Sequence, residues 1–172
     1  MSFARMMNHI LQEQFDNILV AFDAGKHTFR HDIMTDYKAG RAHMPEEMRM
    51  QIAHIKNLLD LLGVKRYEVA LYEADDIIGT MAKKAEGEGY HVDIYSSDKD
   101  LLQLITDNTT VHLTKKGLTD LEDYTPSHFE EVYGIKVPQF IDLKALMGDK
   151  SDNISGVPGI GIKKAVKYLC EY

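Results

Sequence analysis

The sequence has little cysteine, no long apolar run and no repeated or low-complexity segment. Its single thiol, Cys170, excludes both an internal disulfide and a CxxC zinc site. The longest apolar runs, such as residues 18–22, are far shorter than the roughly 20 residues of a membrane-spanning helix, and no signal segment opens the chain. The 172 residues, 44% of them apolar, instead suit an ordinary buried core. We therefore expect a soluble, cytoplasmic protein.

The chain also has fewer basic than acidic residues, 20 against 27, so its formal net charge is -7. The acidity is concentrated in residues 67–152, whereas residues 26–66 and 153–172 carry net positive charge. This distribution indicates a carboxylate metal site flanked by phosphate-binding segments. The alternative is an acidic surface that serves only solubility, and charge alone does not separate the two.

Apolar runs alternate with segments of helical spacing, a pattern typical of an α/β fold with a parallel sheet and flanking helices. The predicted strands are residues 18–22, which we expect to be buried on both faces, 68–71 and 91–95. The predicted helical segments are residues 2–15, 45–62, 74–86, 101–105, 125–133, 138–147 and a last helix after a glycine-rich turn. Residues 24–44 are basic and weakly patterned, which predicts a loop or irregular helical excursion above the sheet.

Acidic residues follow each of the three predicted strands. These residues are Asp23, Glu73, Asp75, Asp76, Asp98 and Asp100. Because the carboxyl ends of parallel strands form the ligand crevice of an open α/β sheet, we expect these carboxylates to converge there. A further pair, Asp149 and Asp152, lies in the polar loop GDKSDN.

So many carboxylates in one place would repel each other unless cations were bound between them. An all-oxygen donor set suits Mg²⁺ or Mn²⁺ better than zinc. Two such ions about 4 Å apart can activate water and stabilise the leaving oxygen in phosphodiester hydrolysis. The structural alternative is that Asp75 and Asp76 are first-turn helix residues and that Asp98 is an N-cap.

Two segments combine the features of phosphate binding. In the basic excursion, Arg30, Tyr37, Lys38 and Arg41 mix cations with an aromatic ring, as nucleic-acid sites do, although a solvated loop has the same composition. The glycine turn is the second segment, and its candidate contacts are Gly156, Gly159, Gly161, Lys163 and Lys164. Amide groups at the start of the helix after this turn can hold a phosphate, although such turns are often purely structural.

Taken in order, FDAGKHTFRHD, YKAGRA, YEADD, SSDKDLLQL, GDKSDN and GVPGIGIKKA resemble the bacterial 5'-3' exonuclease family. That family comprises the N-terminal nuclease domain of DNA polymerase I and stand-alone flap endonucleases. The resemblance covers essentially the whole chain. It implies a PIN-like (resolvase-like) core over residues 1–124, with a helical arch at about 24–47, and a helical segment over 125–172 with a helix-hairpin-helix motif.

The resemblance also assigns roles to residues. Asp23, Glu73 and Asp75 would hold a first divalent ion, and Asp76, Asp98, Asp100, Asp149 and Asp152 a second. Lys38 would contact the scissile phosphate, with Arg41, Arg30 and Tyr37 as supporting arch residues. The glycine turn with Lys163 and Lys164 would hold duplex DNA, and its backbone carbonyls can hold K⁺ in this family.

We therefore expect a metal-dependent 5'-3' exonuclease or flap endonuclease of DNA replication and repair, a monomer whose substrate is DNA with a 5' end or flap, or an RNA–DNA primer junction. The family's first strand, with its metal-binding aspartate, and its last helices are expected to be missing, as in a fragment, an alternative start or a truncated relative. One alternative is a non-catalytic DNA-binding module. Another is a phosphohydrolase that acts on small phosphate esters.

Overall fold

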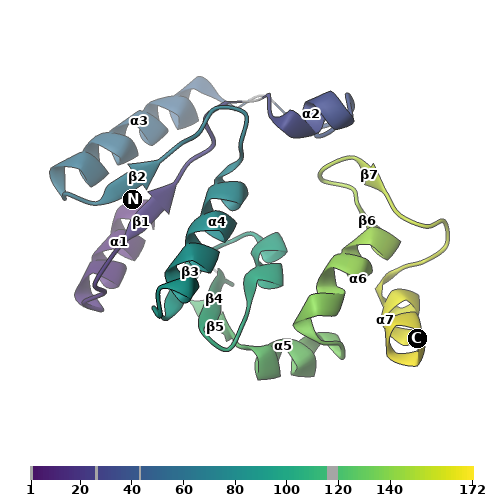
Figure 1. Cartoon of the computed structure of the whole chain (residues 1–172). Helices are drawn as coiled ribbons and strands as arrows, with labels where there is room; N and C mark the ends of the chain where they lie inside the picture. Colours follow the sequence, from purple (N-terminus) through teal and green to yellow (C-terminus); the bar gives the residue numbers. More distant parts are fainter. Residues whose placement is uncertain (1, 26, 43, 116–119) are drawn as a thin grey trace.

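The computed structural model describes residues 2–25, 27–42, 44–115 and 120–172, and it confirms the α/β class (Figure 1). The helices are α1 (Ser2–Gln12), α2 (Phe29–Ile33), α3 (Glu46–Leu61), α4 (Ala74–Gly87), α5 (Pro126–Tyr133), α6 (Phe140–Met147) and α7 (Ile162–Glu171), with short 3-10 turns η1 (Lys99–Leu104) and η2 (Val137–Gln139). The strands are β1 (Leu19–Ala21), β2 (Lys65–Tyr67), β3 (Val92–Ser96), β4 (Thr109–Thr114), β5 (Leu121–Tyr124), β6 (Gly148–Asp149) and β7 (Ile154–Ser155). None of the helices within these ranges is long and apolar enough to cross a bilayer.

The strands form two larger sheets and a small hairpin. Strand β1 pairs with β2 in parallel, as predicted, and β3 pairs in parallel with β4, a strand that the sequence did not predict. Strand β5 runs antiparallel to β4, which the sequence did not predict, and β6 and β7 form an antiparallel hairpin. Within the described ranges β1 and β3 form no ladder with each other, so the sheet is mixed and divided.

The second predicted strand lies at the wrong place in the sequence. The structure has it at residues 65–67, three residues earlier than predicted. Gly63, at φ +69°, ends the α3 segment and turns the chain directly into β2. Leu71 has φ +69°, a left-handed conformation that cannot continue a strand, so the apolar residues before it are exposed instead of paired.

The larger hydrophobic core joins the second sheet to the C-terminal helices. Its fully buried members include Leu102 of η1, Val111 of β4, Phe129 of α5 and Leu143 of α6. The Phe129 ring meets that of Phe140 edge-on, with the centroids 5.5 Å apart. Helices α5 to α7 therefore fold onto the same core as β3 to β5.

A smaller core lies under α1 and α3 beside β1. Met7, Ile10, Leu59 and Val64 are its buried members. Strand β1 itself is only half-buried, so the predicted burial of its segment on both faces is wrong. Helix α1 ends at residue 12, before the predicted end, because Gln14 adopts φ +55° and cannot extend the helix.

Candidate active site

The carboxylates after β1 and before α4 meet at one end of the sheets. Asp23, two residues past β1, accepts a hydrogen bond of 2.8 Å from the backbone N–H of Ala74 at the start of α4. Glu73, immediately before α4, is 93% buried. The charges of Asp23, Glu73 and Asp98 all act on Asp75, which places Asp98, two residues past β3, in the same group. The predicted convergence at the carboxyl ends is therefore observed for these residues.

The surroundings of Asp75 disfavour the charged form of its carboxyl. Burial raises the pKa of its carboxyl to about 6, and repulsion from Asp98, Asp23 and Glu73 adds to that increase. In the described part of the chain, no lysine, arginine or histidine forms an ion pair with Asp23, Asp75 or Asp98. The negative charges of these three carboxylates repel one another, and a bound cation would reduce that repulsion.

Asp76, the next residue, is fully engaged by protein donors. The Arg30 guanidinium donates to both of its oxygens at 2.7 Å, and the backbone N–H of Glu73 donates to it at 2.9 Å. The Arg30 hydrogen bonds hold the pKa of the Asp76 carboxyl below its ordinary value. Asp76 thus caps α4, as in the structural alternative considered from the sequence, and Asp98 likewise caps η1 by accepting from the backbone N–H of Asp100.

Lys38 and Tyr37 reach the carboxylates from the turn that follows α2. The Lys38 ammonium lies 2.6 Å from a carboxylate oxygen of Glu73 and 4.0 Å from Asp152. The buried Tyr37 hydroxyl donates to Asp152 at 3.2 Å and to Glu73 at 3.4 Å. Burial, and then the charges of Glu73 and Asp152, raise the pKa of that hydroxyl, so it stays protonated as a donor.

Arg41 binds Asp152 from the rim of the same turn. Its guanidinium donates to one Asp152 oxygen at 2.5 Å and, more weakly, to the backbone carbonyl of Ser151 at 3.5 Å. The Arg41 side chain is 52% exposed, whereas that of Asp152 is only 13% exposed. Two predicted phosphate-binding cations, Lys38 and Arg41, therefore lie against a predicted metal ligand.

Lys144 is a site residue that sequence reasoning missed. Its ammonium lies 2.7 Å from Asp100 and 2.5 Å from Asp149, so it joins η1 to the β6–β7 hairpin. The other Asp149 oxygen accepts from the backbone N–H and hydroxyl of Ser151. These donors, with Lys144 the largest contributor, hold the pKa of Asp149 well below its ordinary value. The only signal for Lys144 in the sequence is a lone cation within the apolar run of α6.

The eight predicted metal ligands thus divide into two sets. Five of them, Glu73, Asp76, Asp100, Asp149 and Asp152, are paired with lysine or arginine. The other three are Asp23, Asp75 and Asp98. Over the described residues, no three histidine, cysteine, aspartate or glutamate side chains are arranged to hold one ion. The donor chemistry fits a hard divalent cation, and the unpaired set fits it best.

The glycine turn packs tightly at one end and is open at the other. A Cβ on Gly156 would lie 2.2 Å from the Met147 carbonyl carbon, so only glycine fits there. Gly159 has φ +78°, and Gly161 immediately precedes α7 with open space around it. Lys164 donates to the Gly159 carbonyl at 3.0 Å and so braces the turn, while Lys163 is exposed.

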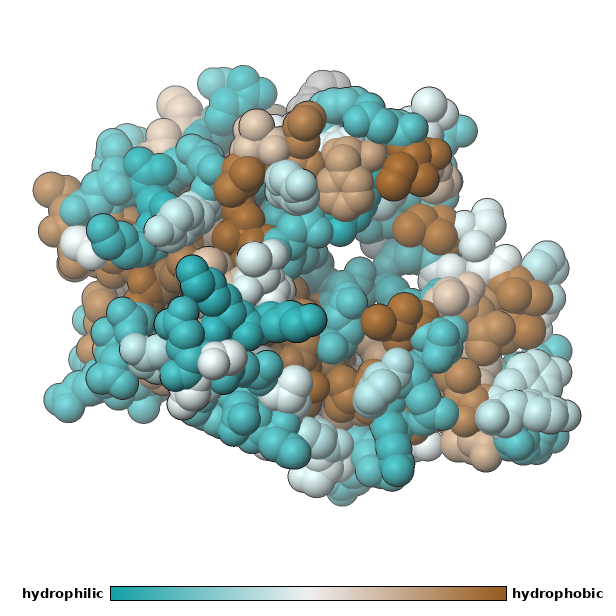
Figure 2. All heavy atoms as spheres, viewed as in Figure 1, coloured by the Kyte–Doolittle hydropathy of each residue, from teal (hydrophilic) through white to brown (hydrophobic). Residues whose placement is uncertain are grey.

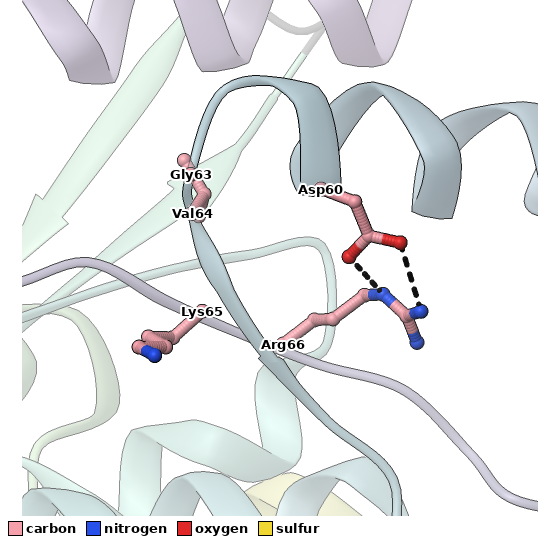
Figure 3. A pocket seen from close by; sticks show the side chains of 5 residues that line it. All are labelled: Asp60, Gly63, Val64, Lys65 and Arg66. Atoms are coloured by element: carbon pink, nitrogen blue, oxygen red, sulfur yellow. Dashed lines mark hydrogen bonds and ion pairs between the residues drawn. The ribbon is translucent and has the colours of Figure 1, made fainter.

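Two depressions of the surface have different positions relative to the carboxylates. The larger, about 440 Å³, lies at the C-terminal end of α3, where Arg66 donates to both oxygens of Asp60 (Figure 3). The smaller, about 300 Å³, is lined in part by Arg30, Asp75 and Asp100. The larger depression lies at the amino end of β2 and is lined by none of the predicted metal ligands. The volume of a depression therefore does not identify the candidate site.

Comparison with known proteins identifies the family. The family profile described as the 5'-3' exonuclease N-terminal resolvase-like domain matches residues 1–134, and the 5'-3' exonuclease C-terminal SAM fold matches residues 135–172. The chain belongs to the 5'-3' exonuclease family. Membership confirms the motif resemblance and the PIN-like fold class.

Individual relatives are similar to this chain over nearly its whole length. DNA polymerase I of Bacillus subtilis is 53% identical over 171 residues, which are 99% of this chain and 19% of that protein. The chain therefore spans about a fifth of the DNA polymerase I relatives it matches. The phage T5 D15 protein, crystallised with metal ions, superposes with a TM-score of 0.83 at 28% identity, covering 98% of this chain and 66% of that one.

A second structure of the phage T5 protein contains bound ligands. The T5 D15 flap endonuclease, in a complex with DNA and metal ions, superposes with a TM-score of 0.81 at 27% identity. The match covers 98% of this chain and 65% of the phage protein. The phage protein thus holds both kinds of ligand on a similar fold.

Proposed function

We propose that this chain is a divalent-metal-dependent 5'-3' exonuclease and 5'-flap endonuclease that hydrolyses phosphodiester bonds of DNA in replication and repair. One observation carries the proposal: Asp23, Asp75 and Asp98 come together at the carboxyl ends of β1 and β3 without a lysine or arginine partner among the described residues. The relatives that act on or bind DNA support the substrate class. We also propose that this chain is active by itself.

Divalent cations would be held by carboxylates at this site. Asp23, Asp75 and Asp98 would rearrange to bind the first, because no protein cation has to leave these side chains. This proposal moves Asp98 to the first ion from the second, where the sequence resemblance puts it. The carboxylates now paired with lysine or arginine would serve the second. When bound, Mg²⁺ or Mn²⁺ supplies charge stabilisation and an activated water for phosphodiester hydrolysis.

The remaining site residues would hold the DNA itself. Lys38 and Arg41, on one turn beside the carboxylates, would contact the phosphate at the cleavage position, with Arg30 and Tyr37 in support. Gly156, Gly159, Gly161 and the exposed Lys163 would hold the duplex backbone at the start of α7. Lys164 would act through the turn that it braces.

We infer the finer properties from the sequence resemblance. Residues 24–47 would form the arch over a single-stranded 5' end, within a core of residues 1–124, and residues 125–172 would carry the helix-hairpin-helix motif with K⁺ on its carbonyls. The chain would act as a cytoplasmic monomer, on RNA–DNA primer junctions as well as on DNA flaps.

Cleavage of a labelled 5'-flap duplex tests the proposal. Wild-type chain should incise the flap near the junction with Mg²⁺ or Mn²⁺ and not with EDTA. Asp75→Asn should abolish incision, and Arg66→Met, which breaks an ion pair in the other depression, should leave it unchanged. Incision that persists in EDTA, or in Asp75→Asn, would contradict the metal assignment.

The ion pairs also favour a second function, a DNA-binding module without turnover. Five of the eight predicted ligands are neutralised by protein cations. In that case a duplex would bind in a salt-dependent way, and no incision would follow with either metal.

A further inference from the structure

The turn that carries Lys38 is docked on the loop that carries Asp152. The backbone N–H of Lys38 donates to the Asp152 carbonyl at 3.0 Å, and the Asn153 side chain donates to the Asp36 carbonyl at 2.9 Å. Lys38 and Asn153 both adopt left-handed backbones, at φ +56° and +59°. In Figure 1, α2, immediately before this turn, lies above the tip of the β6–β7 hairpin. The two segments, 115 residues apart in the chain at Tyr37 and Asp152, are held together by one main-chain hydrogen bond and one hydrogen bond from the Asn153 side chain to the main chain.

Side-chain charges are matched across the same contact. Asp152 accepts from Arg41 with one oxygen and from Tyr37 with the other, and Lys38 lies 4.0 Å from that second oxygen. Lys38 makes its short contact, 2.6 Å, with Glu73. Figure 2 shows an opening in the surface between the upper part of the molecule, where α2 lies in Figure 1, and the C-terminal helices. A carboxylate thus occupies the position that a bound phosphate would take on these donors.

We propose that the Asp152 carboxylate acts as an internal substitute for a DNA phosphate, so that DNA displaces it from Arg41 and Lys38 and thereby frees Asp152 and Glu73 to bind a divalent cation. This inference rests on the proposed function. It makes DNA binding and binding of the second cation mutually supportive, because the same four side chains exchange partners in both events. The two positive charges move from protein carboxylates to DNA phosphates, and the divalent cation takes their place on Asp152 and Glu73.

The exposure of the two cations gives the order of exchange. Arg41 is half-exposed, and an ion pair in that environment contributes little stability, so a phosphate can replace Asp152 there first. Lys38, 20% exposed, pairs with the more buried Glu73 and follows. The main-chain contacts between the turns do not involve these charges, so the turns can stay docked while the side chains exchange.

DNA affinity in EDTA tests the competition without cleavage. Fluorescence anisotropy of a labelled 5'-flap duplex should show Asp152→Asn binding about tenfold more tightly than wild type, within the usual range of such couplings. Its log–log salt slope should also be steeper by about one, because the Arg41–phosphate contact is then no longer offset by loss of the Arg41–Asp152 ion pair. Asp75→Asn is the matched control, since it removes the same charge near Lys38 but no partner of Lys38 or Arg41. Equal tightening in both variants would mean general repulsion and would overturn the proposal.

Cation binding in the absence of DNA tests the second part of the proposal, that Arg41 and Lys38 compete with a divalent cation for Asp152 and Glu73. This test does not require the Asp152 variant to fold. In calorimetric titrations with Mn²⁺, Arg41→Met and Lys38→Met should bind Mn²⁺ several-fold more tightly than wild type. Arg66→Met, which breaks an ion pair with Asp60 elsewhere, should match wild type. Unchanged Mn²⁺ affinity in both site variants would overturn the inference. Failure of the proposed function would look different, because wild type would then show no metal-dependent incision at all.

Discussion

Neighbouring residues Asp75 and Asp76 differ in burial and in their partners, and their pKa values move in opposite directions. Arg30 lowers the pKa of Asp76 through two hydrogen bonds, while burial and three carboxylates raise that of Asp75. The sequence predicted that these carboxylates would gather. It could not show which of them receive a protein cation, because Arg30, Lys38 and Lys144 reach the site only through the tertiary fold.

The raised pKa of Asp75 makes stability depend on pH. Its folded pKa of about 6 exceeds the ordinary value of 3.8, so ionisation opposes folding. The penalty is absent below the ordinary value and complete above the folded one, so stability falls as pH rises through this range. Asp75→Asn should therefore be about 1 kcal/mol more stable than wild type at pH 8 in EDTA, after allowance for solvent screening.

Urea unfolding at pH 4 and pH 8 measures this difference. The gain of Asp75→Asn over wild type should shrink toward zero at pH 4, where the wild-type carboxyl is largely protonated in the folded state. A gain of the same size at both pH values would show that its cause is packing and not charge.

At the scale of elements, the β6–β7 hairpin depends on a close approach of two glycines. Gly148, at φ +72°, has no room for a Cβ because the Gly156 nitrogen would lie 2.2 Å from it. The same hairpin carries Asp149 and presents its turn to residues 36–41. The GVPGIG motif was therefore informative, but its first glycine serves packing and its last one precedes α7.

Alanine substitutions separate these two roles. Gly156→Ala should destabilise the chain by roughly 2–3 kcal/mol, because its Cβ would overlap backbone atoms that cannot rotate away. Gly161→Ala should cost less than about 1 kcal/mol, since its surroundings are open and only the helix cap changes. Thermal unfolding of both variants checks the contrast, and similar losses would place the steric constraint elsewhere.

Elements with regular apolar spacing were predicted well, and the misses have identifiable causes. Helices α4 and α5 begin within one residue of the expected positions, with Thr125 capping α5. Strand β4 was missed because its first inward position is a threonine. Thr109 is 99% buried and donates its hydroxyl to Glu86 at 2.6 Å, so a polar residue fills a core position that a hydropathy pattern cannot reveal.

At the scale of the whole molecule, the order of six motifs predicted the family. The net charge of -7, taken alone, disfavours binding to a polyanion such as DNA. The structure reconciles the two, because part of the negative charge lies at the candidate site, where bound cations would neutralise it. An acidic protein can then bind DNA once cations neutralise that region.

Divalent ions should accordingly stabilise the folded chain. With Mg²⁺ at about a hundred times its dissociation constant, binding contributes about 2.7 kcal/mol, which raises the thermal midpoint by roughly 5–10 °C. EDTA should reverse the shift, and Asp75→Asn should lose most of it. Differential scanning calorimetry with NaCl at equal ionic strength is the control, since an equal shift in NaCl would indicate screening alone.

The two separate hydrophobic cores have a consequence for cooperativity. The smaller core holds α1, α3 and β1, and the larger holds β3 to β5 with the C-terminal helices. Each can lose its protection against hydrogen exchange as its own unit. Asp23 follows β1 in the first unit, whereas Asp98 follows β3 in the second. The candidate site therefore draws its carboxylates from both cores, and we expect heating to disperse them as soon as either core unfolds.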